Sequence, residues 1–89
     1  MLGRVLAVLA MLHASVALAV DVNTASAMEL DGLKGVGPPL SRNILDERKK
    51  NGEFKSWADL MARVKGIKQA KAKALSQEGL TVGDKPYSP

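Results

Sequence analysis

The spacing of apolar residues along this chain predicts four short helices, because apolar side chains recur every three to four positions in four separate stretches. In the last stretch, residues 70–74 alternate Ala and Lys, but both residues are good helix formers and poor strand formers. The expected fold class is therefore all-α, with four to five short helices. The predicted helices run from Ser26 to about Gly32 or Lys34, from Pro38 to about Lys50, over a short stretch opened by Ser56, and over roughly Gln69 to Gln77.

The residues expected in the core are the bulky apolar ones. In the first helix, Met28, Leu30 and Leu33 are expected to turn inward. Phe54 and Trp57 could stack on nucleic-acid bases, as aromatic side chains do in single-strand binders. In a chain with so few aromatic residues, core filling between the two halves is the better explanation.

Capping residues mark two of the predicted helix starts. Ser26 is followed three positions later by Glu29, so that the hydroxyl and the carboxylate would each accept a hydrogen bond from the other's backbone N–H. Ser56 and Asp59 repeat this spacing. At the end of the second helix, Gly52 suits the left-handed conformation that follows many helices.

The segment between the first two helices predicts a tight hairpin. Residues 33–37 read Leu-Lys-Gly-Val-Gly, and two prolines follow. Glycine tolerates positive φ and close approach, and proline suits the first position of a helix. The hairpin and the next helical turn would leave several backbone N–H groups free, at the positive end of the helix dipole. Such a helix start binds anions, and the anion expected here is a DNA phosphate.

The same pattern recurs at residues 64–67, which read Val-Lys-Gly-Ile and indicate a duplicated helix–hairpin–helix unit. The second copy differs where Lys68 replaces the second glycine. Lysine adopts positive φ less readily than glycine, although it adds a cation. We therefore expect the backbone of the first hairpin to bind phosphate better than that of the second. Ser41 and Ala72 occupy matching positions, where small side chains would let the paired helices approach closely.

Basic residues are concentrated around the second hairpin. The chain of 89 residues has a net charge of +4, and removal of a leader containing Arg4 would leave +3. A face of one sign suits a polyanion, although a solvated helix surface explains the charges alone equally well. Between Met61 and Leu75 there is no acidic residue, and the basic residues are Arg63, Lys65, Lys68, Lys71 and Lys73.

Residues 1–19 are typical of a secretory signal peptide. Arg4 precedes an unbroken apolar run over 5–12, and Ala17-Leu18-Ala19 has the pattern of a cleavage site. The alternative is an uncleaved anchor, but the apolar stretch is shorter than the ~20 residues that a spanning helix needs. We therefore expect a periplasmic domain over 20–82, stabilised by helix packing because the chain has no cysteine. Residues 83–89 are expected to form a disordered tail.

The residues that usually carry chemistry are missing after the leader. The one histidine, His13, lies in the predicted signal peptide, and there is no cysteine. The usual nucleophile–base pairs and transition-metal ligands are therefore excluded. Asp46 and Glu47 are adjacent, so their side chains diverge on a helix and cannot share a task. We expect no enzyme activity, no catalytic or metal-binding residue, no cofactor and no small-molecule substrate.

Four motifs of the sequence belong together: Val22-Asn23-Thr24-Ala25-Ser26-Ala27, Leu33-Lys34-Gly35-Val36-Gly37-Pro38, Asn51-Gly52-Glu53-Phe54-Lys55-Ser56 and Val64-Lys65-Gly66-Ile67. Taken together, these motifs resemble the ComEA competence proteins. The resemblance covers about residues 21–82. It implies a tandem helix-hairpin-helix domain that binds double-stranded DNA without sequence specificity. It also implies a periplasmic role in natural transformation, in which incoming DNA is retained without catalysis, with the DNA-uptake machinery as a further partner.

The resemblance also places the residues that contact DNA, in the two hairpins and the helices after them. They are Lys34, Gly35, Val36, Gly37, Arg42, Lys65, Gly66, Ile67, Lys68 and Lys71. Two alternatives remain open at this stage. The same tandem fold resembles the photosystem subunit PsbU, where it serves protein packing without DNA binding. A DNA-coating protein or nuclease accessory protein unrelated to transformation would carry the same motifs.

Overall fold

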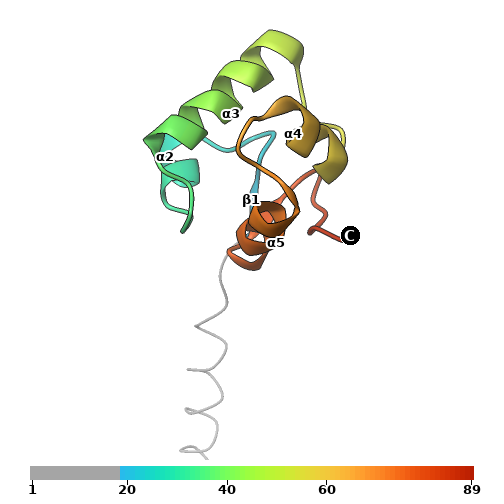
Figure 1. The fold of residues 1–89 in the computed structure, drawn as a ribbon. Helices are drawn as coiled ribbons and strands as arrows, with labels where there is room; N and C mark the ends of the chain where they lie inside the picture. The colour runs from blue at the N-terminus through green and yellow to red at the C-terminus, as the bar shows by residue number, and fades with distance from the viewer. Residues whose placement is uncertain (1–18) are drawn as a thin grey trace, which may run out of the picture.

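The computed structural model describes residues 19–89, so the signal peptide predicted over 1–19 lies almost entirely outside the described residues. Figure 1 shows α2 beside α3 and α4 beside α5, with the start of the chain running between the two pairs. In chain order the elements are β1 (Val20–Asp21), α2 (Ala27–Asp31), α3 (Pro38–Asn51), α4 (Trp57–Arg63), α5 (Gln69–Gln77) and β2 (Leu80–Thr81).

The two helix caps predicted from the sequence are present. At α2 the Ser26 N–H donates to Glu29 Oε1 at 2.9 Å, and the Glu29 N–H donates to Ser26 Oγ at 3.1 Å. This capping box confirms the prediction. At α4 the Asp59 N–H donates to Ser56 Oγ at 3.0 Å, but the Asp59 carboxylate accepts from the N–H of Lys55, one residue before the cap.

The bounds of the two longer helices follow from their terminal residues. Helix α3 begins at Pro38, which fits the first position of a helix, and ends where Gly52 adopts a φ of +83°. Helix α5 covers Gln69–Gln77, as the alanine and lysine content predicted. The chain turns away from α5 at Gly79, where φ is +107°.

Two short strands amend the all-α prediction. β1 and β2 pair in parallel, with Val20 opposite Leu80 and Asp21 opposite Thr81. Each strand has only two residues, so neither can show the alternation of apolar and polar positions that identifies a strand. The fold is therefore mostly helical, and its first and last elements are hydrogen-bonded to each other.

The core is built from apolar residues of all four helices described here and of the connecting segments. Phe54 and Trp57 are 2% and 7% exposed, which confirms that they fill the core. Met28 is 83% exposed, so the prediction that it turns inward is wrong. Residues two positions apart in a helix point in directions that differ by about 200°. Met28 and Leu30 have this spacing, so a helix as short as α2 cannot bury both. The fully buried large side chains are Phe54, Leu30, Ile44, Leu60, Ile67, Leu75, Leu80 and Val22.

Arg63 joins the end of α4 to the segment that follows α3. Its guanidinium donates to the carbonyl oxygens of Gly52 at 2.8 Å and of Glu53 at 2.9 Å. Its Cζ also lies 4.2 Å from the centre of the Phe54 ring, a cation–π distance. The relative position of the two helix pairs is therefore fixed partly by this single side chain.

The last residues of the chain contact the domain, which differs from the disordered tail expected over 83–89. The Trp57 Nε1–H donates to the carbonyl oxygen of Lys85 at 2.9 Å, and the Tyr87 N–H donates to Ser76 Oγ at 2.8 Å. The Tyr87 ring packs edge-on against Trp57, with 5.5 Å between the ring centres. The polar composition of this segment gave no sign of these contacts, because its partners lie in α4 and α5.

Candidate nucleic-acid interface

The first hairpin, residues 33–37, and the second hairpin, residues 64–68, have the same turn geometry. Gly35 has a φ of +93° and Gly66 a φ of +100°, values that other residues rarely adopt. In the first hairpin the Val36 N–H donates to the Leu33 carbonyl oxygen. In the second hairpin the Ile67 N–H donates to the Val64 carbonyl oxygen. Val36 and Ile67 are buried, so each hairpin is anchored to the core by its central apolar side chain.

The replacement of a glycine by Lys68 does not strain the second hairpin. Gly37 is the N-cap of α3 with a φ of −93°, and Lys68 is the N-cap of α5 with a φ of −120°. Both values are open to any residue, because the positive φ falls on the first glycine of each motif. The expectation that a lysine here costs the turn its geometry is therefore wrong.

The two hairpins differ instead in their backbone donors. Besides the N-cap, the first three residues of a helix have N–H groups without a partner within the helix. Helix α3 starts with Pro38 and Pro39, which have no N–H, so that only Leu40 can donate from this turn. Helix α5 starts with three residues that each have an N–H, 69–71. The second hairpin is therefore the richer backbone site, in contrast to the expectation from the sequence.

The starts of α3 and α5 also differ from those of α2 and α4 in a way that favours an external anion. Neither α3 nor α5 has a side-chain cap or an acidic residue in its first turn. Helices α2 and α4 each have a side-chain cap and an acidic residue in the first turn. The positive ends of α3 and α5 are thus left without compensation from their own first turns.

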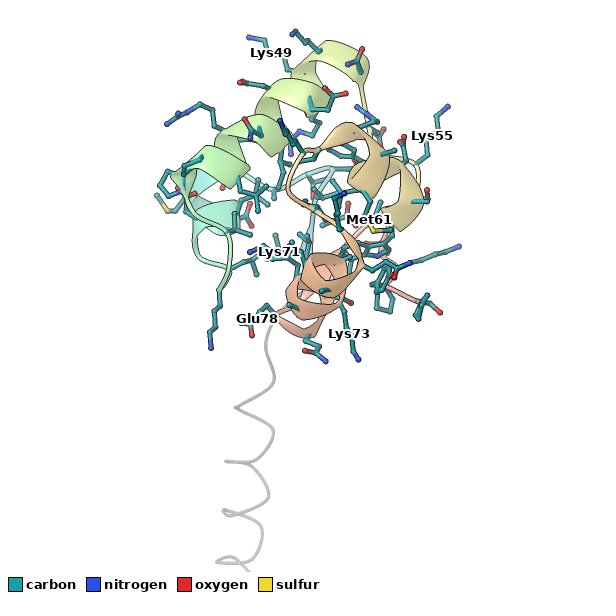
Figure 2. All side chains as sticks on the ribbon, viewed as in Figure 1. Lys49, Lys55, Met61, Lys71, Lys73 and Glu78 are labelled. Carbon is teal, nitrogen blue, oxygen red and sulfur yellow. The ribbon has the colours of Figure 1, made fainter. Side chains whose placement is uncertain are left out.

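The two hairpins open onto one shallow groove with a volume of about 380 Å³, which we call the hairpin groove. Figure 2 shows Lys71 on the side of α5 that faces the α2–α3 turn. Its Nζ lies 3.2 Å from the position that a Cβ atom would occupy on Gly35. The groove is lined by Gly35, Gly37, Pro39, Leu40, Asn43, Lys65, Gly66 and Lys71.

Comparison with known proteins identifies the family. A sequence family described as a helix-hairpin-helix motif matches residues 16–78, which is most of the chain. This chain belongs to the helix-hairpin-helix family.

One relative of this helix-hairpin-helix protein is ComE operon protein 1 of Bacillus subtilis (strain 168), which is 42% identical over 48 residues. The matched stretch is 54% of this chain and 23% of the relative, so the likeness concerns one part of a longer protein. The resemblance to ComEA that the sequence motifs indicated is confirmed over this stretch. No solved structure matches the chain at a significant level.

The lining of the hairpin groove in this helix-hairpin-helix protein includes two lysines and no carboxylate. Neighbouring surface depressions do contain carboxylates. The depression between α3 and α4 has Asp46 and Glu47, and the one between α2 and α3 has Asp31 and Asp46. Among these depressions, the hairpin groove is the one suited to a negatively charged ligand.

Arg63 does not belong to the exposed basic face of this helix-hairpin-helix protein. Its Nε lies 3.1 Å from Glu47 Oε1, and its Nη1 lies 3.1 Å from Asp59 Oδ2. Hydrogen bonds from Asn51 and Arg63 lower the pKa of Glu47, and those from the Lys55 N–H and Arg63 lower the pKa of Asp59. Both carboxylates therefore stay ionised and hold the guanidinium. Of the other basic residues of 61–75, Lys65 and Lys71 line the hairpin groove, whereas Lys68 and Lys73 are exposed outside it.

The structure brings together only some of the residues that the sequence predicted for DNA contact. Val36 and Ile67 are buried, so only their backbone atoms could reach a ligand. Lys34 and Lys68 are exposed at their hairpins but do not line the groove. Arg42 lies in the depression between α2 and α3 rather than in the hairpin groove.

Three groove residues of this helix-hairpin-helix protein were not predicted: Pro39, Leu40 and Asn43. Pro39 and Asn43 are four positions apart in α3 and therefore share one helix face, a spacing that was available in the sequence. Within residues 19–89, no three carboxylate or histidine side chains are grouped as a metal site would need. No helix in this range is long and apolar enough to cross a membrane.

Proposed function

We propose that this protein binds double-stranded DNA through the backbone phosphates and without sequence preference. The observation that carries the proposal is the hairpin groove. Its lining includes two lysines and residues from the starts of α3 and α5, which have no side-chain cap, and it includes no carboxylate. Helix N-termini and lysine side chains are the groups that bind phosphate. Contacts of this kind fix the position of the duplex but do not read its bases.

We further propose that the two helix–hairpin–helix units act as one tandem module. The shared φ values at Gly35 and Gly66 support this, because both units then present the same turn to a ligand. A duplex offers two backbones, and a protein with two matched hairpins could contact phosphates on both.

The cellular role that we propose is retention of incoming DNA in the periplasm during natural transformation. The likeness to ComE operon protein 1 and the signal peptide predicted over 1–19 support this role. Retention requires binding but no bond cleavage. This agrees with a sequence that has neither histidine nor cysteine after residue 13, and we do not propose an enzyme.

A titration tests the binding function. Residues 19–89, which contain all the described helices and the core, are titrated with two unrelated duplexes of about 30 base pairs at several salt concentrations. We expect equal affinity for both duplexes and a log–log salt slope equivalent to roughly three to six phosphate contacts at about 0.9 each. Failure to bind at low salt would contradict the proposal, and the hairpins would then be packing devices as in PsbU.

A matched pair of variants locates the interface. Lys65 lines the hairpin groove, whereas Lys49 lies near the far end of α3 (Figure 2). Both are exposed lysines, so Lys65→Ala and Lys49→Ala remove the same charge. We expect Lys65→Ala to lower the salt slope by about 0.9 and Lys49→Ala to leave it unchanged. Equal slopes in the two variants would place the DNA elsewhere.

The cellular role is tested separately. The host gene is deleted, and fluorescent duplex that is protected from external nuclease is measured in the periplasm. We expect protected DNA to be lost on deletion and restored by the wild-type chain but not by Lys65→Glu. If the amount of protected duplex is unchanged after deletion, the proposed role in DNA retention is contradicted, while the proposed DNA binding is unaffected.

A further inference from the structure

Lys71 belongs to the second unit by sequence but reaches the first hairpin. It is in the first turn of α5, yet its Nζ is the nearest atom to the position of a Cβ on Gly35, at 3.2 Å, followed by Leu75 Cδ2 at 3.8 Å. A Cβ at this position would be in tight contact with the ammonium, which would have to shift by a few tenths of an ångström. Gly66 at the matching position of the second hairpin has nothing within 4 Å of a Cβ. The two hairpins are therefore not equivalent.

The surroundings of Lys71 indicate a charge kept available for a ligand. Its side chain is partly buried, whereas Lys65, Lys68 and Lys73 are exposed. Among the contacts within residues 19–89, its ammonium has neither an ion pair nor a hydrogen bond, and both ion pairs there are made by Arg63. Partial burial without an acidic partner weakens solvation of the ammonium and strengthens its attraction to an anion that enters the groove.

The first hairpin and α3 contribute no cation to the lining of the groove. Because Pro38 and Pro39 remove two N–H donors, the first turn of α3 offers fewer backbone groups than the first turn of α5. On this side the groove is lined by glycine, proline and leucine residues and by Asn43, with no charged side chain from α3. An anion at the first hairpin would therefore meet the ammonium of Lys71 as its nearest groove cation.

We propose that Lys71 binds the phosphate held at the first hairpin, so that the two hairpins form one composite site. The second unit supplies a cation in the groove, where the first unit has none. This inference rests on the proposed binding of DNA and assigns a role to one side chain within it. Loss of Lys71 should therefore weaken contacts at the first hairpin, although the residue belongs to the second.

Amide chemical shifts distinguish a composite site from two separate ones. Uniformly ¹⁵N-labelled residues 19–89 are titrated with a duplex, and the shifts of the Gly35 and Leu40 amides are compared with those of Gln69 and Ala70. The variant is Lys71→Met, which keeps the aliphatic stem, and the matched control is Lys73→Met on the exposed side of the same helix. Lys71→Arg tests whether another cation restores the effect.

We expect Lys71→Met to reduce the duplex-induced shifts at Gly35 and Leu40 and to lower the log–log salt slope by about 0.9. Lys73→Met and Lys71→Arg should leave the first-hairpin shifts in place. If Lys71→Met reduces only the shifts at Gln69 and Ala70, the composite site is overturned while DNA binding stands. If the wild-type chain shows no shift at either hairpin, the proposed function itself fails.

Discussion

The side-chain amide of Asn23 makes two hydrogen bonds with the backbone of Phe54. Its Nδ2 donates to the Phe54 carbonyl oxygen at 2.9 Å, and its Oδ1 accepts from the Phe54 N–H at 2.7 Å. Arg48 Nη1 also donates to the carbonyl oxygens of Val22 and Ala25. The segment before the first helix is thereby tied to the segment between the two units.

Asn23→Ala should destabilise the domain by about 1–3 kcal/mol, because it leaves the backbone groups of a buried residue without partners. Urea denaturation followed by circular dichroism measures this loss. Asn43→Ala, which removes an exposed amide from α3, is the control and should change the free energy of unfolding by no more than about 0.5 kcal/mol. Equal effects of the two variants would contradict the bridging role of Asn23.

Gly35→Ala and Gly66→Ala separate backbone strain from crowding. Both place a side chain at positive φ, which costs about 1–3 kcal/mol of stability in each case. Only Gly35→Ala also pushes against the Lys71 ammonium. We therefore expect similar melting temperatures for the two variants but weaker duplex binding by Gly35→Ala. Similar affinities would show that the Lys71 ammonium can shift without loss of binding.

Asp21 should make stability depend on acidic pH. Burial acts to raise the pKa of its carboxyl, but hydrogen bonds from the N–H groups of Asp84 and Asn23, the hydroxyl of Thr81 and the N–H of Gly83 bring it below the ordinary value of 3.8. A lowered folded-state pKa stabilises the fold above the unfolded pKa, and this stabilisation is lost as pH falls through the folded value.

Asp21→Asn should therefore be less stable than the wild type at neutral pH, with the difference shrinking in acid. Unfolding free energies from about pH 7 to about pH 2 measure this convergence. Asp46→Asn, an exposed residue of α3 that makes none of these contacts, is the control. A constant difference between wild type and Asp21→Asn at every pH would show that the charge is not involved.

Pro39→Ala should strengthen binding of the first hairpin to phosphate. The change returns an N–H to the first turn of α3, and one further hydrogen bond would raise the affinity for duplex between about two- and tenfold. The loss of proline should cost about 0.4–1 kcal/mol of stability. Pro86→Ala removes an exposed proline away from the groove and should leave affinity unchanged. Lower affinity of Pro39→Ala would contradict a backbone site here.

Tyr87→Ala should shift the fluorescence of Trp57, the one tryptophan of the chain. Removal of the edge-on ring exposes the indole to water, so we expect emission at longer wavelength and a loss of about 1 kcal/mol in stability. Tyr87→Phe keeps the ring and should behave as the wild type. An unchanged emission maximum in Tyr87→Ala would favour the disordered tail expected from the sequence.

Local chemistry explains which parts of the fold could be predicted. The capping box at Ser26, the start of α3 at Pro38 and the turn at Gly35 depend on neighbouring residues, so the sequence alone identified them. The pairing of β1 with β2 joins residues about 60 positions apart, and no local pattern indicates it. The burial of Phe54 was predictable because a large aromatic side chain in a small chain has few other places to go.

The candidate site was less predictable, because it forms between segments. The resemblance to ComEA places Lys71 in the second motif, and only the packing of α5 beside the first hairpin brings it against Gly35. The ion pair of Arg63 with Glu47 joins two helices and could not be read from local spacing, whereas its pair with Asp59, four residues earlier in α4, has a spacing that was available in the sequence. The effect of Lys68 on its turn could not be predicted, because the sequence does not show which of the two glycines of the first hairpin takes positive φ.

The parallel pairing of β1 with β2 has a mechanical consequence. The Val20 N–H donates to the Gly79 carbonyl oxygen, and the Val22 N–H donates to that of Thr81. Force applied at Val20 and at the far end of β2 pulls two parallel strands in opposite directions along their length, so these bonds are loaded together rather than one after another. A pull on these two ends of the described fold would therefore be resisted by both hydrogen bonds at once.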